Sequence, residues 1–124
     1  MSATNYSDCT IEQLLSIFEH ACLEQYECWF TDDIDKSNAE YDNLVAVKDE
    51  LQLRGDDARR ALAGLMSHDN PQVRVQAAKF VYPVAREDAR RCLEALAATQ
   101  LPVQRLNAGM TLGFLEEKPD CLDH

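Results

Sequence analysis

The sequence predicts that the whole chain, residues 1–124, forms one all-α domain, a short right-handed stack of helical hairpins with about six helices in three antiparallel pairs. The first observation is an internal repeat: residues 57–82 return as residues 88–113, offset by 31 residues, with nine of 26 positions identical. The second is that apolar residues recur at helical spacing, and no segment alternates as a strand does. Because a repeated unit of this length buries its apolar face against its neighbours, the pattern favours stacked hairpins over a closed bundle.

The first predicted helix covers residues 11–29. Thr10 and Gln13 form a capping box in front of it, in which each side chain accepts a hydrogen bond from the other residue's backbone. Its expected apolar stripe consists of Ile11, Leu14, Leu15, Phe18, Cys22 and Trp29. The polar residues 31–33 then break the helix.

The second predicted helix covers residues 36–53, and Gly55 stands where a glycine commonly ends a helix. Its expected buried positions are Tyr41, Leu44, Val45, Val47 and Leu51. This first hairpin, residues 9–55, is longer than the repeats and differs from them in sequence. We therefore expect it to be the acidic N-terminal capping layer of the stack.

The first repeat, residues 56–84, is predicted to be a hairpin with a shorter first helix, capped by Asp56 or Asp57. Asn70 and Pro71 have the residue types of an N-cap and a first helical position, so they should open its second helix. A proline after that helix ends it.

The second repeat, residues 87–116, should form the same hairpin, with helices over residues 87–98 and 102–115. Pro102 opens the second of these helices as its counterpart does in the first repeat. Residues 117–124 are expected to be a frayed tail.

Residues 70–78 resemble the second-helix signature of HEAT and HEAT-like repeats, in which Asn-Pro precedes a Val-Arg pair and an Ala follows the Arg by three residues. Arg74 and Ala77 hold the last two positions of that signature. The second repeat retains its proline, arginine and alanine as Pro102, Arg105 and Ala108. Because alanine is small, we expect the second helices of the repeats to approach their neighbours closely at Ala77 and Ala108.

Residues 43–115 also resemble a small bacterial family of HEAT-like proteins that is described as a domain of unknown function. The features that carry this resemblance outside the signature are Asn43, Glu50-Leu51, Arg54-Gly55, Ala58-Arg59, Leu65 and His68. The resemblance implies a binding surface without catalytic residues. For some proteins of this kind it implies a role as immunity proteins against secreted toxins.

The negative charge is concentrated in the first hairpin. Residues 1–53 contain twelve acidic and two basic side chains, whereas residues 54–124 contain ten of each. One interpretation is a solvated cap that keeps the end of the stack in solution. The other is a docking surface for a basic protein, with candidate residues Glu24, Tyr26, Glu27, Phe30, Asp32, Asp33, Asp35, Tyr41 and Asp42. Trp29, in the same region, is expected to be buried.

The arginines of the repeats are interpreted as structural. Arg74 and Arg105 are expected to bridge stacked turns through acids such as Asp69 and Asp88, beside the structural residues Pro71, Pro102, Ala77 and Ala108. A nucleic-acid site is disfavoured because a net charge of −10 repels a polyanion.

We therefore expect a non-catalytic module that binds a more basic protein, in the manner of an inhibitor or immunity protein, without metal or cofactor. The alternative is a small ligand bound on a concave face, near Gln76, Lys79, Asn107 and Thr111. The N-terminus resembles no secretory signal, no apolar run is long enough to span a membrane, and the cysteines lack a C-x-x-C pair. A cytoplasmic protein, monomeric or weakly homodimeric, is expected.

Overall fold

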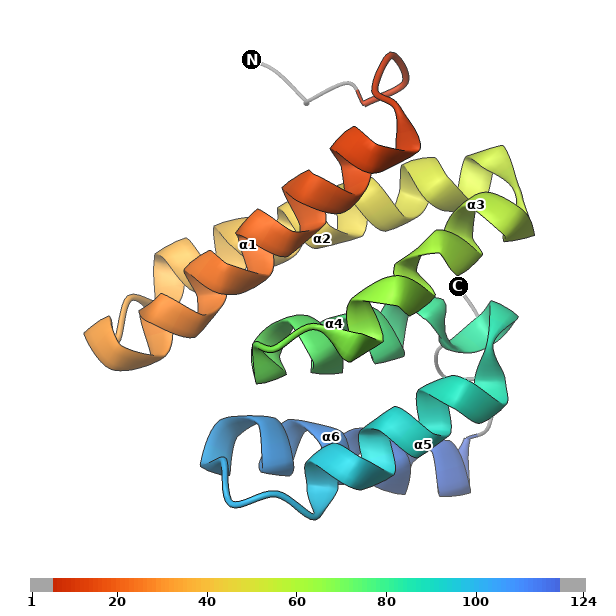
Figure 1. Ribbon diagram of the computed structural model, residues 1–124. Helices are drawn as coiled ribbons and strands as arrows, with labels where there is room; N and C mark the ends of the chain where they lie inside the picture. Colours follow the sequence, from red (N-terminus) through yellow and green to blue (C-terminus); the bar gives the residue numbers. More distant parts are fainter. Residues whose placement is uncertain (1–5, 119–124) are drawn as a thin grey trace. The chain divides into compact units, whose positions relative to one another are not determined.

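The computed structural model describes residues 6–118, which form six α-helices and two 3₁₀ segments and contain no strand (Figure 1). The all-α fold with helices paired in hairpins is therefore confirmed. These residues divide into two compact units, with the boundary between Ala61 and Leu62. That the whole chain forms a single domain stays a prediction. Of the predicted tail, residues 119–124 lie outside the described residues.

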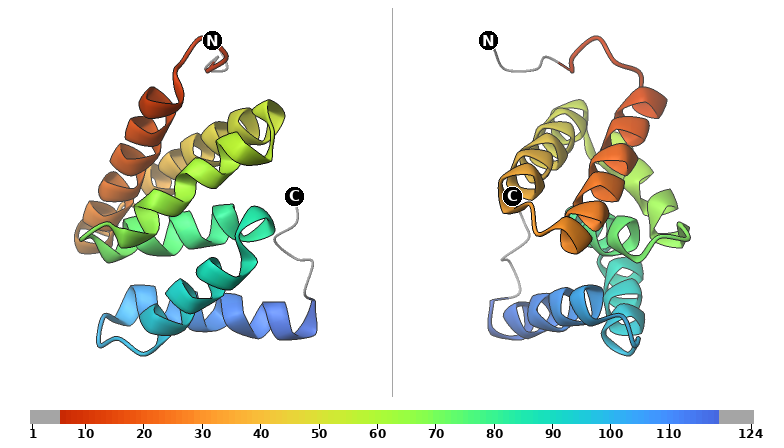
Figure 2. Two further views of the ribbon diagram at one scale, coloured as in Figure 1. Left: turned by 45° about the vertical axis from the view of Figure 1, so that its right-hand side comes forward. Right: turned by 90° about the vertical axis from the view of Figure 1, so that its left-hand side faces the viewer.

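In the first unit, α1 (Ile11–Thr31) and α2 (Ile34–Arg54) lie side by side and antiparallel, and the short α3 (Asp56–Arg60) follows (Figure 2). The predicted capping box before α1 is confirmed. The Thr10 backbone N–H donates to Gln13 Oε1 at 2.8 Å, and the Gln13 N–H donates to Thr10 Oγ1 at 3.1 Å.

Two residues link α1 to α2. Asp32 ends α1 with φ 59°, in the left-handed region that aspartate tolerates better than most residues. Asp33 caps α2, since its Oδ1 accepts a hydrogen bond from the Lys36 N–H at 3.0 Å. The break between the two helices was predicted at this place.

Gly55 separates α2 from α3. Its φ of 113° is a conformation that residues with a Cβ rarely adopt, which explains why a glycine stands there. The prediction that Asp56 or Asp57 caps the next helix is wrong, because Gly55 itself is the N-cap and makes no side-chain hydrogen bond. The two aspartates occupy the first turn of α3, where their negative charge interacts favourably with the positive end of the helix dipole.

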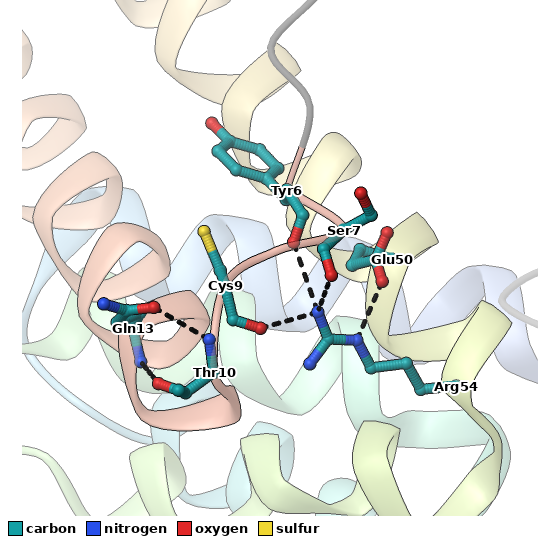
Figure 3. Close-up of polar contacts among 7 residues, drawn as sticks. All are labelled: Tyr6, Ser7, Cys9, Thr10, Gln13, Glu50 and Arg54. Atoms are coloured by element: carbon teal, nitrogen blue, oxygen red, sulfur yellow. Dashed lines mark hydrogen bonds and ion pairs between the residues drawn. The ribbon is translucent and has the colours of Figure 1, made fainter.

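The guanidinium of Arg54 fixes the segment that precedes α1 (Figure 3). Its Nη2 donates to the backbone oxygens of Cys9, Tyr6 and Ser7 at 2.7, 3.2 and 3.2 Å. Its Nε donates to Glu50 Oε2 at 2.8 Å, which orients the guanidinium from within α2. The end of α2 is thereby joined to the start of α1.

The second unit contains most of the 3₁₀ segment η1 (Ala61–Ser67), then α4 (Pro71–Val81), η2 (Tyr82–Val84), α5 (Arg86–Ala97) and α6 (Pro102–Glu117). Asn70 caps α4 as predicted, with its Oδ1 accepting from the Gln72 N–H at 2.8 Å. The first helix of the first repeat, however, becomes a 3₁₀ helix after Arg60, whereas its counterpart α5 is a continuous α-helix. Gly64 stands where α5 has Ala95, and glycine disfavours an α-helix interior.

The structure confirms most of the predicted core. Ala77 and Ala108 are fully buried, as the repeat implied. Gln104 of α6 donates from Nε2 to Gln72 Oε1 of α4 at 2.9 Å, a buried contact between the second helices of the two repeats. The exceptions are Ile11, Trp29 and Tyr41, which were expected inside and are exposed.

Candidate protein-binding surface

Exposed apolar side chains surround the bend between α1 and α2. Trp29, Phe30 and Ile34 are 59%, 67% and 69% exposed, and Tyr41 is also at the surface. The expectation that Trp29 is buried is wrong, because helical spacing gives a side chain's direction but not whether another element covers it. At this end of α1, residues 34–36 of α2 are themselves exposed and leave Trp29 uncovered.

Two aromatic rings of α1 pack against each other next to this bend. The Tyr26 and Phe30 rings meet edge to face, with centroids 5.3 Å apart and an interplanar angle of 76°. One helical turn separates the two residues, so the helix itself sets this geometry. Phe30 thus contacts the Tyr26 ring although most of its own surface faces solvent.

Some of the acidic residues here stabilise the hairpin. Glu24 of α1 pairs with Lys36 of α2 at 3.0 Å. The hydrogen bond and charge of Lys36 hold the pKa of Glu24 below its usual value, and Glu24 in turn raises the pKa of Lys36. Asp33 is occupied as the helix cap.

Other acidic residues leave their carboxylates at the surface. Glu27, Asp32, Asp35 and Asp42 are exposed and form no ion pair with any residue between Tyr6 and Lys118. They lie on the end of α1, the link and the first half of α2, the segments that carry the exposed aromatics. We call this surface the acidic bend: Glu24, Tyr26, Glu27, Trp29, Phe30, Asp32, Asp33, Ile34, Asp35, Tyr41 and Asp42.

The candidate partner-binding residues that the sequence suggested all lie in one unit of the structure, on α1, the link and α2. Sequence reasoning missed Ile34, since it lies between the predicted break at residues 31–33 and the helix predicted from residue 36. Its signal was an isolated large apolar residue among polar neighbours.

Two arginines of the repeats, Arg74 and Arg105, differ from expectation. Among residues 6–118, Arg74 and Arg105 form no ion pair with Asp69 or Asp88, and the buried Nε of Arg74 has no hydrogen-bond partner there. Asp88 pairs with Arg91 on its own helix instead, as Asp57 does with Arg60 at 2.7 Å. A carboxylate three residues before an arginine reaches it without crossing to another element.

The alternative ligand site is mostly closed. Gln76 and Thr111 are buried, and the Thr111 hydroxyl donates to the Asn107 backbone oxygen at 2.8 Å. Lys79 is half-buried, and burial lowers the pKa of its ammonium group. Only Lys79 and Asn107 of the suggested set therefore reach the surface.

Nucleophile and metal sites gain no support from the geometry. Burial raises the pKa of the Cys22 and Cys92 thiols, which disfavours the reactive thiolate. Within the described part of the chain, no group of three or more His, Cys, Asp or Glu side chains is placed to hold a metal ion. No helix there is long and apolar enough to cross a membrane.

Comparison with known protein families identifies the family of this chain. The model of a domain of unknown function, DUF2019, matches residues 12–116. The chain belongs to this family. The crystal structure of the protein RPA1889 from Rhodopseudomonas palustris CGA009 is similar to it, with a TM-score of 0.90 and 32% sequence identity over 94% of this chain and 96% of that one. No curated protein matches the chain. The resemblance to a bacterial family of this description is confirmed, whereas the HEAT-like superhelix stays a prediction.

Proposed function

We propose that this protein is a non-catalytic interaction module that binds a more basic protein through the acidic bend. The observation that carries the proposal is that Trp29, Phe30 and Ile34 are exposed and surrounded by carboxylates. Among residues 6–118, Glu24 is the one carboxylate of this group that forms an ion pair, with Lys36. Aromatic side chains with an apolar contact area and few rotamers are typical of binding hot spots. Three large apolar side chains exposed close together in the sequence are typical of an interaction site.

The two kinds of side chain have different roles in this proposal. Carboxylates within about 8 Å, the Debye length in physiological salt, attract a basic partner and raise the association rate. The aromatic residues then lose water in the complex and set the dissociation rate. The partner should therefore present lysine or arginine around an apolar patch. An inhibitor or immunity protein that occludes a basic target is one form of this function.

A capture experiment identifies the partner. Wild-type protein and the double variant Trp29→Ala/Phe30→Ala serve as baits in an extract of the native organism. Leu53→Ala is the matched control, because Leu53 is 82% exposed on α2 but lies at the opposite end of the hairpin. We expect a basic protein retained by wild type and control and lost from the double variant. Retention by all three baits contradicts the proposal.

Association kinetics with that partner test the charge. The variant Asp32→Asn/Asp33→Asn/Asp35→Asn keeps the α2 cap, since asparagine caps a helix as well as aspartate. The control Asp8→Asn/Glu12→Gln/Asp56→Asn removes the same number of charges from the other end of the hairpin. We expect the first variant to associate several-fold more slowly with a flatter salt dependence, and the control much less so. Equal rates for both variants would mean that the acidic bend is only a solvated cap.

A further inference from the structure

Helix α6 carries a second exposed apolar surface, which the proposed function does not use. Leu106, Met110 and Phe114 are 64%, 53% and 56% exposed and follow one another at intervals of four residues, so they share one face of the helix. We call these three residues the α6 ridge. A shallow groove adjoins it, lined by Ala97, Arg105, Leu106, Gly109 and Met110.

The sequence repeat shows which face of the helix this is. In α4, Gln72 contacts Gln104 of α6 and so marks the face of α4 that meets α6. Val75 and Lys79 follow Gln72 by three and seven residues and lie on that same face. Adding the repeat offset of 31 residues to Val75 and Lys79 gives Leu106 and Met110. Two of the three residues of the α6 ridge are therefore the repeat counterparts of a face that is an interface in α4.

The two faces differ in what covers them. Val75 is fully buried in α4, whereas Leu106 is mostly exposed in α6. By the repeat, α6 has a face equivalent to the one that α4 uses against α6, and no residue between Leu62 and Lys118 covers that face.

The glycines of α6 fit an interface on this side. Gly109 replaces the buried Ala78 of α4, and a Cβ added at Gly109 or Gly113 meets no atom within 4 Å. No packing within the described part of the chain therefore requires glycine at these positions, although glycine destabilises a helix interior relative to alanine. Glycines next to the ridge allow another helix to approach closely.

The charge distribution favours a second copy of this chain as the occupant of the ridge. Residues 1–61 contain fourteen acidic and five basic side chains, but residues 62–124 contain eight and seven, so two copies can meet at α6 with little repulsion. Arg105 and Glu116 lie on the same side of α6, eleven residues apart, before and after the ridge. If two α6 helices cross antiparallel about a twofold axis near Met110, Arg105 of each copy faces Glu116 of the other.

We propose that the α6 ridge is a homodimer interface, in which a second copy of this chain packs its own α6 antiparallel across the first. The interface is isologous, with Leu106, Met110 and Phe114 at its centre and two Arg105–Glu116 pairs at its rim. It lies on a different unit from the acidic bend and does not depend on the function proposed for that surface.

Sedimentation equilibrium of the full chain over a concentration series tests the dimer. We expect wild type to form dimers reversibly and Met110→Lys to weaken dimerisation about tenfold or more, because a lysine on the axis meets its symmetry mate. Leu53→Lys, at an exposed apolar position of the first unit, is the matched control and should dimerise like wild type. A wild type that stays monomeric up to about 1 mM overturns the proposal. Oligomers larger than dimers also overturn the proposal, because a head-to-tail contact would produce them.

Charge exchange tests the orientation. Arg105→Glu and Glu116→Arg should each weaken the dimer several-fold by placing like charges together, and the double variant should restore it. A double variant weaker than either single one contradicts the antiparallel arrangement. If Met110→Lys instead lowers the melting temperature of a monomeric protein, the ridge is covered within its own chain and the proposal fails.

Discussion

Helices α4 and α6 share a sequence signature but differ in how much of their surface is covered. In α4 nearly every residue from Pro71 to Ala78 is buried, Arg74 being the exception. In α6 the buried residues are confined to one side, at Gln104, Ala108, Thr111 and Leu115. The repeat therefore encodes a helix and its inner face, whereas burial of the outer face depends on whether another helix packs onto it. Substitutions at equivalent positions of the two helices test this difference.

The largest effect is expected at the two inner alanines. Ala77 and Ala108 are fully buried at equivalent positions, so replacing either by leucine forces side chains into a filled space. Ala77→Leu and Ala108→Leu should each lower the free energy of unfolding by about 1–3 kcal/mol. Urea unfolding monitored by circular dichroism measures this. Unchanged stability of both variants would contradict the shared inner face.

The outer faces of the two helices should respond differently from each other. Val75→Ala removes buried methyl groups and should cost about 1–2 kcal/mol in unfolding free energy. Leu106→Ala removes a larger side chain from an exposed equivalent position and should change stability by no more than about 0.5 kcal/mol at concentrations where the chain is monomeric. The same urea titrations compare them. Equal losses would mean that α6 is covered as α4 is.

Gly64 offers a smaller effect of opposite sign. A Cβ at Gly64 meets no atom within 4 Å, and its counterpart in the continuous helix α5 is Ala95. Gly64→Ala should raise the free energy of unfolding by about 0.5–1 kcal/mol, since alanine loses less backbone freedom on folding. It should also increase the helical circular dichroism signal. Destabilisation would show that the 3₁₀ segment is required by its surroundings.

The smallest effect concerns the ion pair of the acidic bend. Lys36 lowers the pKa of Glu24 from its ordinary value of 4.5, so the pair stabilises the fold above that pH and the gain is lost as pH falls through the lowered pKa. We expect wild type to be slightly more stable than Glu24→Gln at pH 7 and the two to converge on acidification. High salt should also reduce the difference at pH 7. A stability difference that persists at pH 2 would mean that an interaction other than this ion pair causes it.

Local signals in the sequence predicted the ends of most helices. A helix end is set by residues that bond its free backbone N–H groups or that adopt a non-helical conformation, and both effects involve only neighbouring residues. The examples here are Thr10 with Gln13, Asn70 with Pro71, and Gly55. The exposure of Trp29 was not predictable in this way, because it depends on where a different helix begins.

The change from α3 to η1 lies between these cases. Gly64 was visible in the sequence, but a single glycine is tolerated in many helices, and its effect here depends on the packing around it. Likewise, Arg74 and Arg105 were assigned to acids of neighbouring turns because spacing alone does not rank local against distant partners. The acidic bend was predicted as a region because charge density needs no tertiary information.

The Arg54 guanidinium has a consequence for the order in which the first hairpin assembles. The two-residue link at Asp32 and Asp33 closes a short loop at little entropic cost, whereas the contact between Cys9 and Arg54 closes one of 45 residues. Arg54 is the last residue of α2, so its contacts with the carbonyl groups of Tyr6 and Ser7 depend on the last turn of that helix. We therefore expect α1 and α2 to pair from the bend outward, with the segment before α1 docking last.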